Sequence, residues 1–177
     1  TRSTVGTTTE IYDYLRLLFA KIGHTICPDC GVEVRPDTVQ GTVDRLLSEH
    51  PGKRALVLYP LPITAATTGP GLVANLLAEG FVRVKVRDQV QTLTPTLTLD
   101  LAGLAQLEVV VDRLVLGEGQ RSRLAESLET AFIKGGGMAL VEIPGEGLWR
   151  LSDQFHCLSC GRIFERPTPL FFSFNNP

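Results

Sequence analysis

Two short cysteine motifs, one near each end of the chain, constrain the fold more than any other feature of the sequence. They are Cys27-Pro28-Asp29-Cys30-Gly31 and Cys157-Leu158-Ser159-Cys160-Gly161. In a C-x-x-C-G turn both sulfurs can reach one ion at about 2.3 Å, and the glycine allows a tight turn whose N–H groups point at the sulfurs. The chain has 4 cysteines, which is the number that one closed tetrahedral Zn²⁺ site requires. We therefore predict a single structural zinc that anchors both ends of the intervening stretch, residues 31–156.

Two alternatives to a shared site stay open. Each pair could form a redox site, but thioredoxin-like motifs lie at a strand-to-helix junction, usually after an aromatic residue, whereas the first pair here follows a predicted helix. The second pair could also complete its site with cysteines beyond residue 177. Four thiolates leave no open coordination position, so we expect a non-catalytic metal. We expect His24 and His156 to support the ligands or to lie on the surface.

Length and composition predict a globular protein with a core of its own. The chain has 177 residues, of which 44% are hydrophobic and 20% are charged, and its formal net charge is −2 at pH 7. This balance favours neither a nucleic-acid nor a membrane partner, and no apolar run has the length of a membrane span. Paired C-x-x-C cysteines favour a reducing compartment, so we expect a cytoplasmic protein. The sequence begins with Thr1 and not with a Met, and residues 171–177 end in an apolar run. We therefore expect this chain to be a piece of a longer protein.

Hydrophobic periodicity predicts interleaved helices and strands without strict βαβ regularity. The predicted helices cover residues 8–22, 38–50, 72–79 and 122–134, and the first two are capped by Thr7 with Glu10 and by Asp37 with Gln40. The predicted strands cover residues 55–59, 81–87, 90–93, 107–116, 138–143 and 148–151, with a loop at 60–71 and a turn at Asp88-Gln89. We expect an α/β or α+β fold in which helices cover a mixed sheet. Residues 1–35 and 150–177 would form the zinc module, and residues 36–149 an inserted domain.

Basic side chains alternate with valines in the strand predicted at residues 81–87. Arg83, Lys85 and Arg87 share one face, which would ordinarily be solvated, although like charges in a row repel unless an acidic partner meets them. Arg113 follows Asp112 in an apolar strand, where its simplest role is an ion pair with an acidic neighbour. The glycine-rich stretches do not continue into G-K-[ST], and no nucleophile elbow is present, so the sequence gives no catalytic site.

Several blocks of the sequence resemble UvrA, the damage-recognition ATPase of the bacterial nucleotide-excision-repair excinuclease. In the family's order along the chain, the blocks are RSTVGT at residues 2–7, TEIYDYLRLLFA at 9–20, GFVRV at 80–84, VVVDRL at 109–114, RLAESLETA at 123–131 and FSFNNP at 172–177. The resemblance implies an internal piece of the first nucleotide-binding half. That piece would hold the edge of the DNA-contacting signature region, the first zinc module and the inserted domain that docks UvrB.

The resemblance also implies a function and a set of contact residues. The chain would be a non-catalytic module that docks UvrB, with Zn²⁺ as its own cofactor. ATP would be bound only by other parts of the parent ABC-type ATPase, which would be a homodimer and would contact DNA. Two family arginines that meet acidic residues of UvrB match Arg83 and Arg113, and we expect Lys85 and Arg87 to extend that surface. The alternative is a zinc-containing module of the same ATPase that contacts DNA. Residues 61–69 lack the basic segment that family members usually carry there.

Overall fold

The chain divides into two units in a computed structural model, which describes residues 10–173. One unit contains Thr1–Arg35 and Gln154–Pro177, and the other is Pro36–Asp153. Each unit has buried hydrophobic residues of its own. The boundary that we predicted after residue 149 falls inside a strand, because the last strand of the larger unit continues to Ser152.

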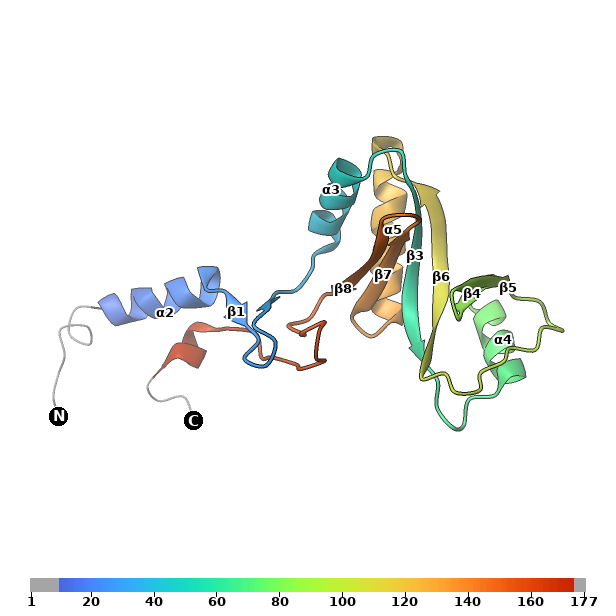
Figure 1. Cartoon of the computed structure of the whole chain (residues 1–177). Helices are drawn as coiled ribbons and strands as arrows, with labels where there is room; N and C mark the ends of the chain where they lie inside the picture. The colour runs from blue at the N-terminus through green and yellow to red at the C-terminus, as the bar shows by residue number, and fades with distance from the viewer. Residues whose placement is uncertain (1–9, 174–177) are drawn as a thin grey trace. The chain divides into compact units, whose positions relative to one another are not determined.

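The larger unit contains a six-stranded sheet (Figure 1). Its strands are β3 (Arg54–Pro62), β4 (Arg83–Val86), β5 (Gln89–Thr92), β6 (Gln106–Val115), β7 (Met138–Ile143) and β8 (Gly147–Ser152), in the order β5-β4-β6-β3-β7-β8. The α+β class is confirmed, but every strand pairing is antiparallel, where we predicted a mixed sheet. The reason is that β3 lies between β6 and β7. These two strands therefore run parallel to each other without being hydrogen-bonded neighbours.

Helices cover one face of this sheet. They are α3 (Val39–Glu49), α4 (Gly69–Ala78) and α5 (Arg121–Lys134), the last preceded by the short η1 (Glu118–Gln120). Helix α5 contacts β3, β6, β7 and α3. Among the fully buried residues of the shared core are Val43, Leu46, Val57, Val73, Val109, Leu124 and Leu128. The core therefore lies between the helices and one face of the sheet, as the helical and alternating patterns predicted.

A smaller apolar cluster marks the other face, which we call the second face of the sheet. Leu58, Val110 and Leu140 are buried there with the partly buried Leu56 beside them. These residues come from β3, β6 and β7. In each strand they alternate with residues of the main core, as the period of two requires.

A β-bulge in β6 sets which side chains reach the second face. Val57 pairs with Asp112, but the next residue of β3, Leu58, pairs with Val110, so Val111 is an extra residue in β6. An extra residue inverts the alternation beyond it. Consequently Leu114 enters the main core, whereas Arg113 lies on the second face, opposite Leu56.

Strand β3 extends into the stretch that we predicted as a loop. Pro60 and Pro62 continue the ladder opposite Glu108 and Gln106 of β6. Prolines lack an N–H donor and are tolerated where one side of a strand needs no hydrogen bonds. Pairing with β7 ends at Leu58, so beyond that point β3 is an edge strand on the β7 side. The loop prediction holds for residues 63–68 but was wrong for residues 60–62, because proline content alone does not reveal this one-sided pairing.

Two local predictions in the larger unit also need correction. Thr38, not Asp37, is the N-cap of α3, and its hydroxyl accepts a hydrogen bond from the Gly41 N–H at 3.1 Å. The Asp37 carboxylate instead accepts from the Ser152 N–H at 3.0 Å. The β4–β5 turn is Arg87-Asp88, where both residues have positive φ, as two-residue hairpins of this kind require.

In the smaller unit, residues 10–35 and 154–173 contain little regular structure. Their elements are α2 (Ile11–Ile22), β1 (Thr25–Ile26), β2 (Glu33–Val34) and η2 (Pro169–Phe172), and β1 pairs with β2. Tyr12 and Arg16 of α2 donate hydrogen bonds to the carbonyl oxygens of Phe172 and Pro169. The cap predicted at Thr7 lies outside the described residues.

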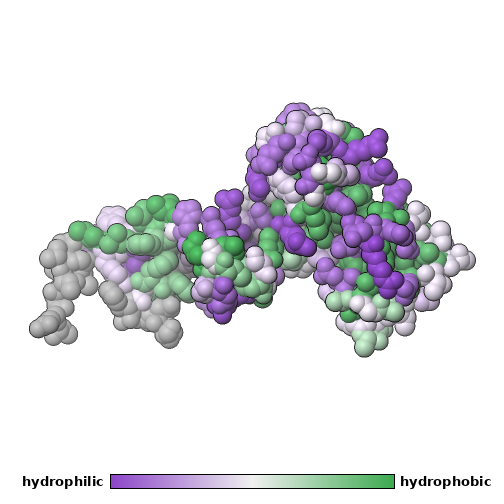
Figure 2. Space-filling view, viewed as in Figure 1, coloured by the Kyte–Doolittle hydropathy of each residue, from purple (hydrophilic) through white to green (hydrophobic). Residues whose placement is uncertain are grey.

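The apolar stripe of α2 is not buried, although we predicted core packing for it. The helix has no buried residue, and Phe19 and Ile22 are 55% and 65% exposed. Figure 2 shows apolar surface where Figure 1 draws α2. In residues 10–173, no helix combines the length and the hydropathy that a membrane crossing requires.

Candidate metal centre and arginine surface

The two cysteine motifs form matching turns. In the first turn, the Cys27 N–H bonds to the Val32 carbonyl at 2.9 Å, and the Gly31 N–H bonds to the Cys27 carbonyl at 2.8 Å. In the second, the Cys157 N–H bonds to the Arg162 carbonyl, and the Gly161 N–H bonds to the Cys157 carbonyl, both at 2.8 Å. Gly31 and Gly161 have φ of 68° and 78°, a conformation that favours glycine. The same local chemistry thus presents two sulfurs from each end of the chain.

The four sulfurs converge on one point. The Sγ atoms of Cys27, Cys30, Cys157 and Cys160 all lie within 4.8 Å of one another, and Cys27 Sγ is 3.6 Å from Cys160 Sγ. A tetrahedral zinc with bonds of about 2.3 Å places its sulfurs about 3.8 Å apart. Cys27 and Cys157 are buried beside Val34 and two phenylalanines, whereas Cys30 and Cys160 are exposed. The donor set and the spacing fit Zn²⁺ with four thiolate ligands.

The environment of the sulfurs favours a cation. Backbone N–H groups of Cys160 and Ser159 hold the pKa of the Cys157 thiol at about 7, below its ordinary value. The pKa of the Cys30 thiol is raised to about 12. The largest cause is its hydrogen bond with the Cys160 side chain, followed by desolvation. Four thiolates at this separation repel one another unless a positive ion lies among them. Zinc would supply that charge.

One ion pair connects the two cysteine turns, and two histidine contacts lie near them. Asp29 of the first turn pairs with Arg162 of the second at 3.1 Å. The ring of His156 makes a 3.0 Å contact with the Gly161 carbonyl, and that of His24 a 2.8 Å contact with Glu33. Neither histidine belongs to the group of potential metal ligands among the described residues. His156 contacts the second turn, whereas His24 is an exposed residue beside β1, so each fits one of the two roles that we predicted.

The basic residues predicted to meet a partner fall into two pairs with different surroundings. Lys85 is buried and forms ion pairs with Glu142 at 3.0 Å and Asp88 at 3.1 Å. Burial alone would lower its pKa, but these carboxylates outweigh burial and raise it. Arg87 pairs with Asp100 at 2.6 Å and donates to the Ala102 carbonyl. The expected solvated face is wrong for Lys85, because the sheet brings Glu142 against it.

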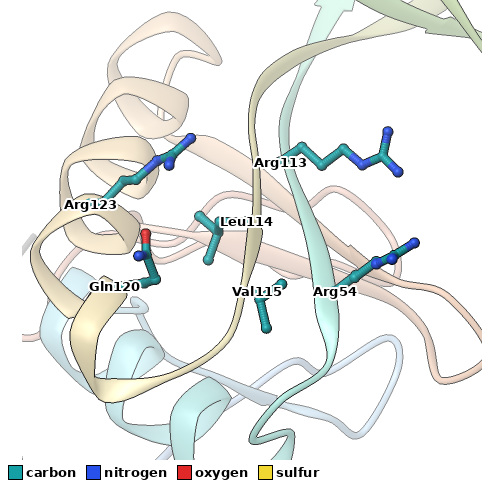
Figure 3. Close-up of a pocket in the computed structure, with 6 residues that line it drawn as sticks. All are labelled: Arg54, Arg113, Leu114, Val115, Gln120 and Arg123. Atoms are coloured by element: carbon teal, nitrogen blue, oxygen red, sulfur yellow. The ribbon is translucent and has the colours of Figure 1, made fainter.

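Arg83 and Arg113 lack such partners. Within residues 10–173, neither guanidinium has a hydrogen bond or ion pair, and both groups line one cavity of about 720 Å³ beside the second face. The ion pair that we predicted for Arg113, with Asp112 or with Glu108, does not form. Asp112 lies on the helix side, where its carboxylate pairs with Arg123 of α5 at 2.7 Å. Figure 3 shows Arg113 projecting from the strands on the side away from the helix that carries Arg123.

Sequence reasoning missed a third arginine in this place. Arg54, the first residue of β3, also lines the cavity and has no ion pair in the described part of the chain. The register places Arg54 opposite Val115, and Leu56 opposite Arg113, so the two arginines are diagonal neighbours on one face. Figure 3 shows both projecting from the same side. The available signal was Lys53-Arg54 directly before an apolar strand, but the partner strand was not known.

The Asp112 contacts predict a pH dependence. Burial opposes ionisation of this carboxyl, but hydrogen bonds from Arg123, the Arg113 N–H and Ser127 outweigh burial and lower its pKa below the ordinary value of 3.8. The ionised form therefore stabilises the fold above pH 4, and this contribution is lost as the pH falls through the folded-state pKa.

We expect Asp112→Asn to lower the free energy of unfolding by about 2 kcal/mol at neutral pH, because Arg123 and Ser127 lose a charged partner. The difference from the parent should shrink toward about pH 2, as urea unfolding at several pH values would measure. Glu126→Gln, at an exposed position of α5, is the control. A difference that is independent of pH would contradict this role of Asp112.

Comparison with known proteins identifies the family. A family model described as "UvrA interaction domain" matches residues 37–145. The UvrABC system protein A of Oceanobacillus iheyensis is 40% identical over 178 residues, which is 99% of this chain and 18% of that protein. The proteins of the same name from Thermus thermophilus and Bacillus subtilis are 40% and 38% identical, each over 99% of this chain and over 19% and 18% of their own lengths. The chain therefore spans less than one fifth of these relatives. Because the family model matches more than half of its residues, the chain belongs to the UvrA interaction domain family.

Proposed function

We propose that this chain is the part of a UvrA protein that docks UvrB during nucleotide excision repair. Support comes from the match to the UvrA interaction domain over residues 37–145 and from relatives named UvrABC system protein A. The single observation that carries the docking role is a pair of arginines, Arg83 and Arg113, without intramolecular partners in the described residues, at one cavity of the matched domain. Such guanidinium groups suit carboxylates of a partner, which they can bind through two parallel hydrogen bonds.

The charge distribution supports association by electrostatic complementarity. Acidic side chains outnumber basic ones over residues 36–153, so the unpaired arginines form a local positive site on an otherwise acidic unit. A site of this kind attracts an acidic patch and repels basic surfaces, and salt weakens the association. Lys85 and Arg87 contribute by anchoring the β4–β5 hairpin, which carries Arg83, through Glu142 and Asp100.

The zinc site has a structural role in this proposal. Four thiolate ligands close the coordination sphere, so Zn²⁺ would join the two cysteine turns without activating water. Cys27 and Cys30 precede the docking unit, and Cys157 and Cys160 follow it. The metal would thereby fix both chain ends that lead to that unit. ATP hydrolysis and DNA contact would belong to other parts of the parent protein.

Titration with UvrB tests the docking role. We expect Arg83→Glu and Arg113→Glu each to raise the Kd for UvrB about tenfold or more, because reversed charge repels an acidic patch. Calorimetric titration at low and moderate salt measures this. Arg150→Glu is a matched control, because Arg150 is an exposed arginine of the same sheet, on β8 and outside the cavity.

The outcomes separate docking from the alternatives. If both variants bind UvrB as the parent does, the docking surface is misassigned. Tight binding of a DNA duplex by the chain, with a steep salt dependence that both substitutions reduce, would favour the DNA-contacting module instead.

A further inference from the structure

We infer that Arg54 completes a three-arginine receptor, Arg54, Arg83 and Arg113, that takes an acidic segment of UvrB with an apolar side chain at its centre. This inference rests on the proposed docking of UvrB and adds a residue and a partner chemistry to it. The residues that carry it surround the cavity of about 720 Å³, which all three arginines line.

The three arginines come from three strands that the sheet brings together. Arg54 begins β3, Arg113 lies near the end of β6, and Arg83 begins β4, which pairs with β6. The bulge at Val111 decides the side on which Arg113 lies. If Val111 took a regular place in the ladder instead of bulging, Arg113 would point toward α5, and Arg54 and Arg83 would have no third cation between them. The receptor is therefore a product of register rather than of sequence proximity.

The neighbouring cationic side chains, unlike these three arginines, form ion pairs with carboxylates. Lys53 pairs with Glu146, Lys85 with Glu142, Arg87 with Asp100 and Arg123 with Asp112. In the described residues, no carboxylate lies within ion-pair distance of Arg54, Arg83 or Arg113. Three like charges around one cavity repel one another, so an anion that enters it relieves the repulsion and gains hydrogen bonds.

The lining between the arginines selects the kind of anion. Leu56, Val90 and Pro144 contribute apolar surface to the cavity, and Val90 is 46% exposed. The phosphates of a nucleic acid cannot fill this apolar part of the cavity. They would also be repelled by the acidic unit that surrounds the small positive site. A peptide segment with carboxylates on either side of an apolar side chain matches both the guanidinium groups and the apolar floor. The geometry thus favours an acidic protein segment over nucleic acid.

The test compares single substitutions in the whole chain by calorimetric titration with UvrB. We expect Arg54→Glu to raise the Kd about tenfold, and Arg54→Lys to raise it less, since the charge remains but the planar fork is lost. Val90→Ser should raise the Kd severalfold, because the apolar contact is lost. Arg150→Glu should bind as the parent does. The salt dependence of the Kd should be weaker for Arg54→Gln than for Arg150→Gln.

Each outcome supports or overturns the inference, separately from the proposed function. If Arg83→Glu and Arg113→Glu weaken binding but Arg54→Glu matches Arg150→Glu, the receptor lacks Arg54, and the inference fails while UvrB docking stands. If none of the three substitutions weakens binding, both proposals fail. If Arg54→Glu leaves UvrB binding intact but abolishes binding of a labelled DNA duplex, nucleic acid is the ligand and the inference is overturned. Should Arg54→Glu unfold the chain, Arg54→Gln gives the same comparison with less perturbation.

Discussion

Replacing Cys157 by serine is expected to release the metal and to unfold the cysteine turns while the six-stranded sheet remains folded. A structural zinc contributes on the order of 10 kcal/mol to a small unit that folds around it. The buried cluster of the smaller unit consists only of Cys27, Val34 and Cys157 among the described residues, with Phe155 and Phe164 packed against it, so little else offsets that loss. The larger unit has a separate and much larger core and does not depend on the metal.

Hydrogen exchange measured by mass spectrometry would show this local effect. We expect loss of protection at residues 20–35 and 154–165 and nearly unchanged protection in β3, β6 and α5. Zinc content per chain should fall in parallel. Ser159→Ala is the matched control, because it changes the same turn without removing a sulfur. Cooperative unfolding of the whole chain, or zinc retained at one ion per chain by the variant, would contradict the role of Cys157.

Deleting Val111 is expected to leave the register of the larger unit and the docking of UvrB intact. The deletion removes the extra residue of the bulge, so Arg113 still pairs with Leu56 and the side chains beyond position 110 keep their faces. Leu114, which is 5% exposed, would stay in the main core. The loss of stability should be limited to the contacts of the partly buried Val111 side chain, about 2 kcal/mol.

Urea unfolding followed by circular dichroism, together with UvrB titration, tests the bulge. Val111→Ala keeps the number of residues and therefore the register, so this variant should lose about 1 kcal/mol and bind UvrB as the parent does. A deletion variant that unfolds, or that no longer binds UvrB, would show that the register beyond the bulge does not hold Arg113 in place.

The candidate metal centre could be predicted from the cysteine spacing alone. Two residues between cysteines and a following glycine are local requirements, and the turns satisfy them with hydrogen bonds inside each motif. The number of cysteines then left one shared site as the simplest arrangement. The periodic apolar patterns likewise predicted α3, α5 and most strands, because each of these elements buries one regular face in the main core.

The features that follow from the amino-acid order are therefore local: the two cysteine turns, the positions of most helices and strands, and a set of basic residues. Three others depend on long-range pairing, namely that β3 lies between β6 and β7, that Lys85 is buried against Glu142, and that Arg54 joins Arg83 and Arg113 at one cavity. The physical reason is that register and a single bulge bring together strands distant in sequence, and a shift of one residue moves a side chain to the opposite face. No periodicity within one strand carries that information.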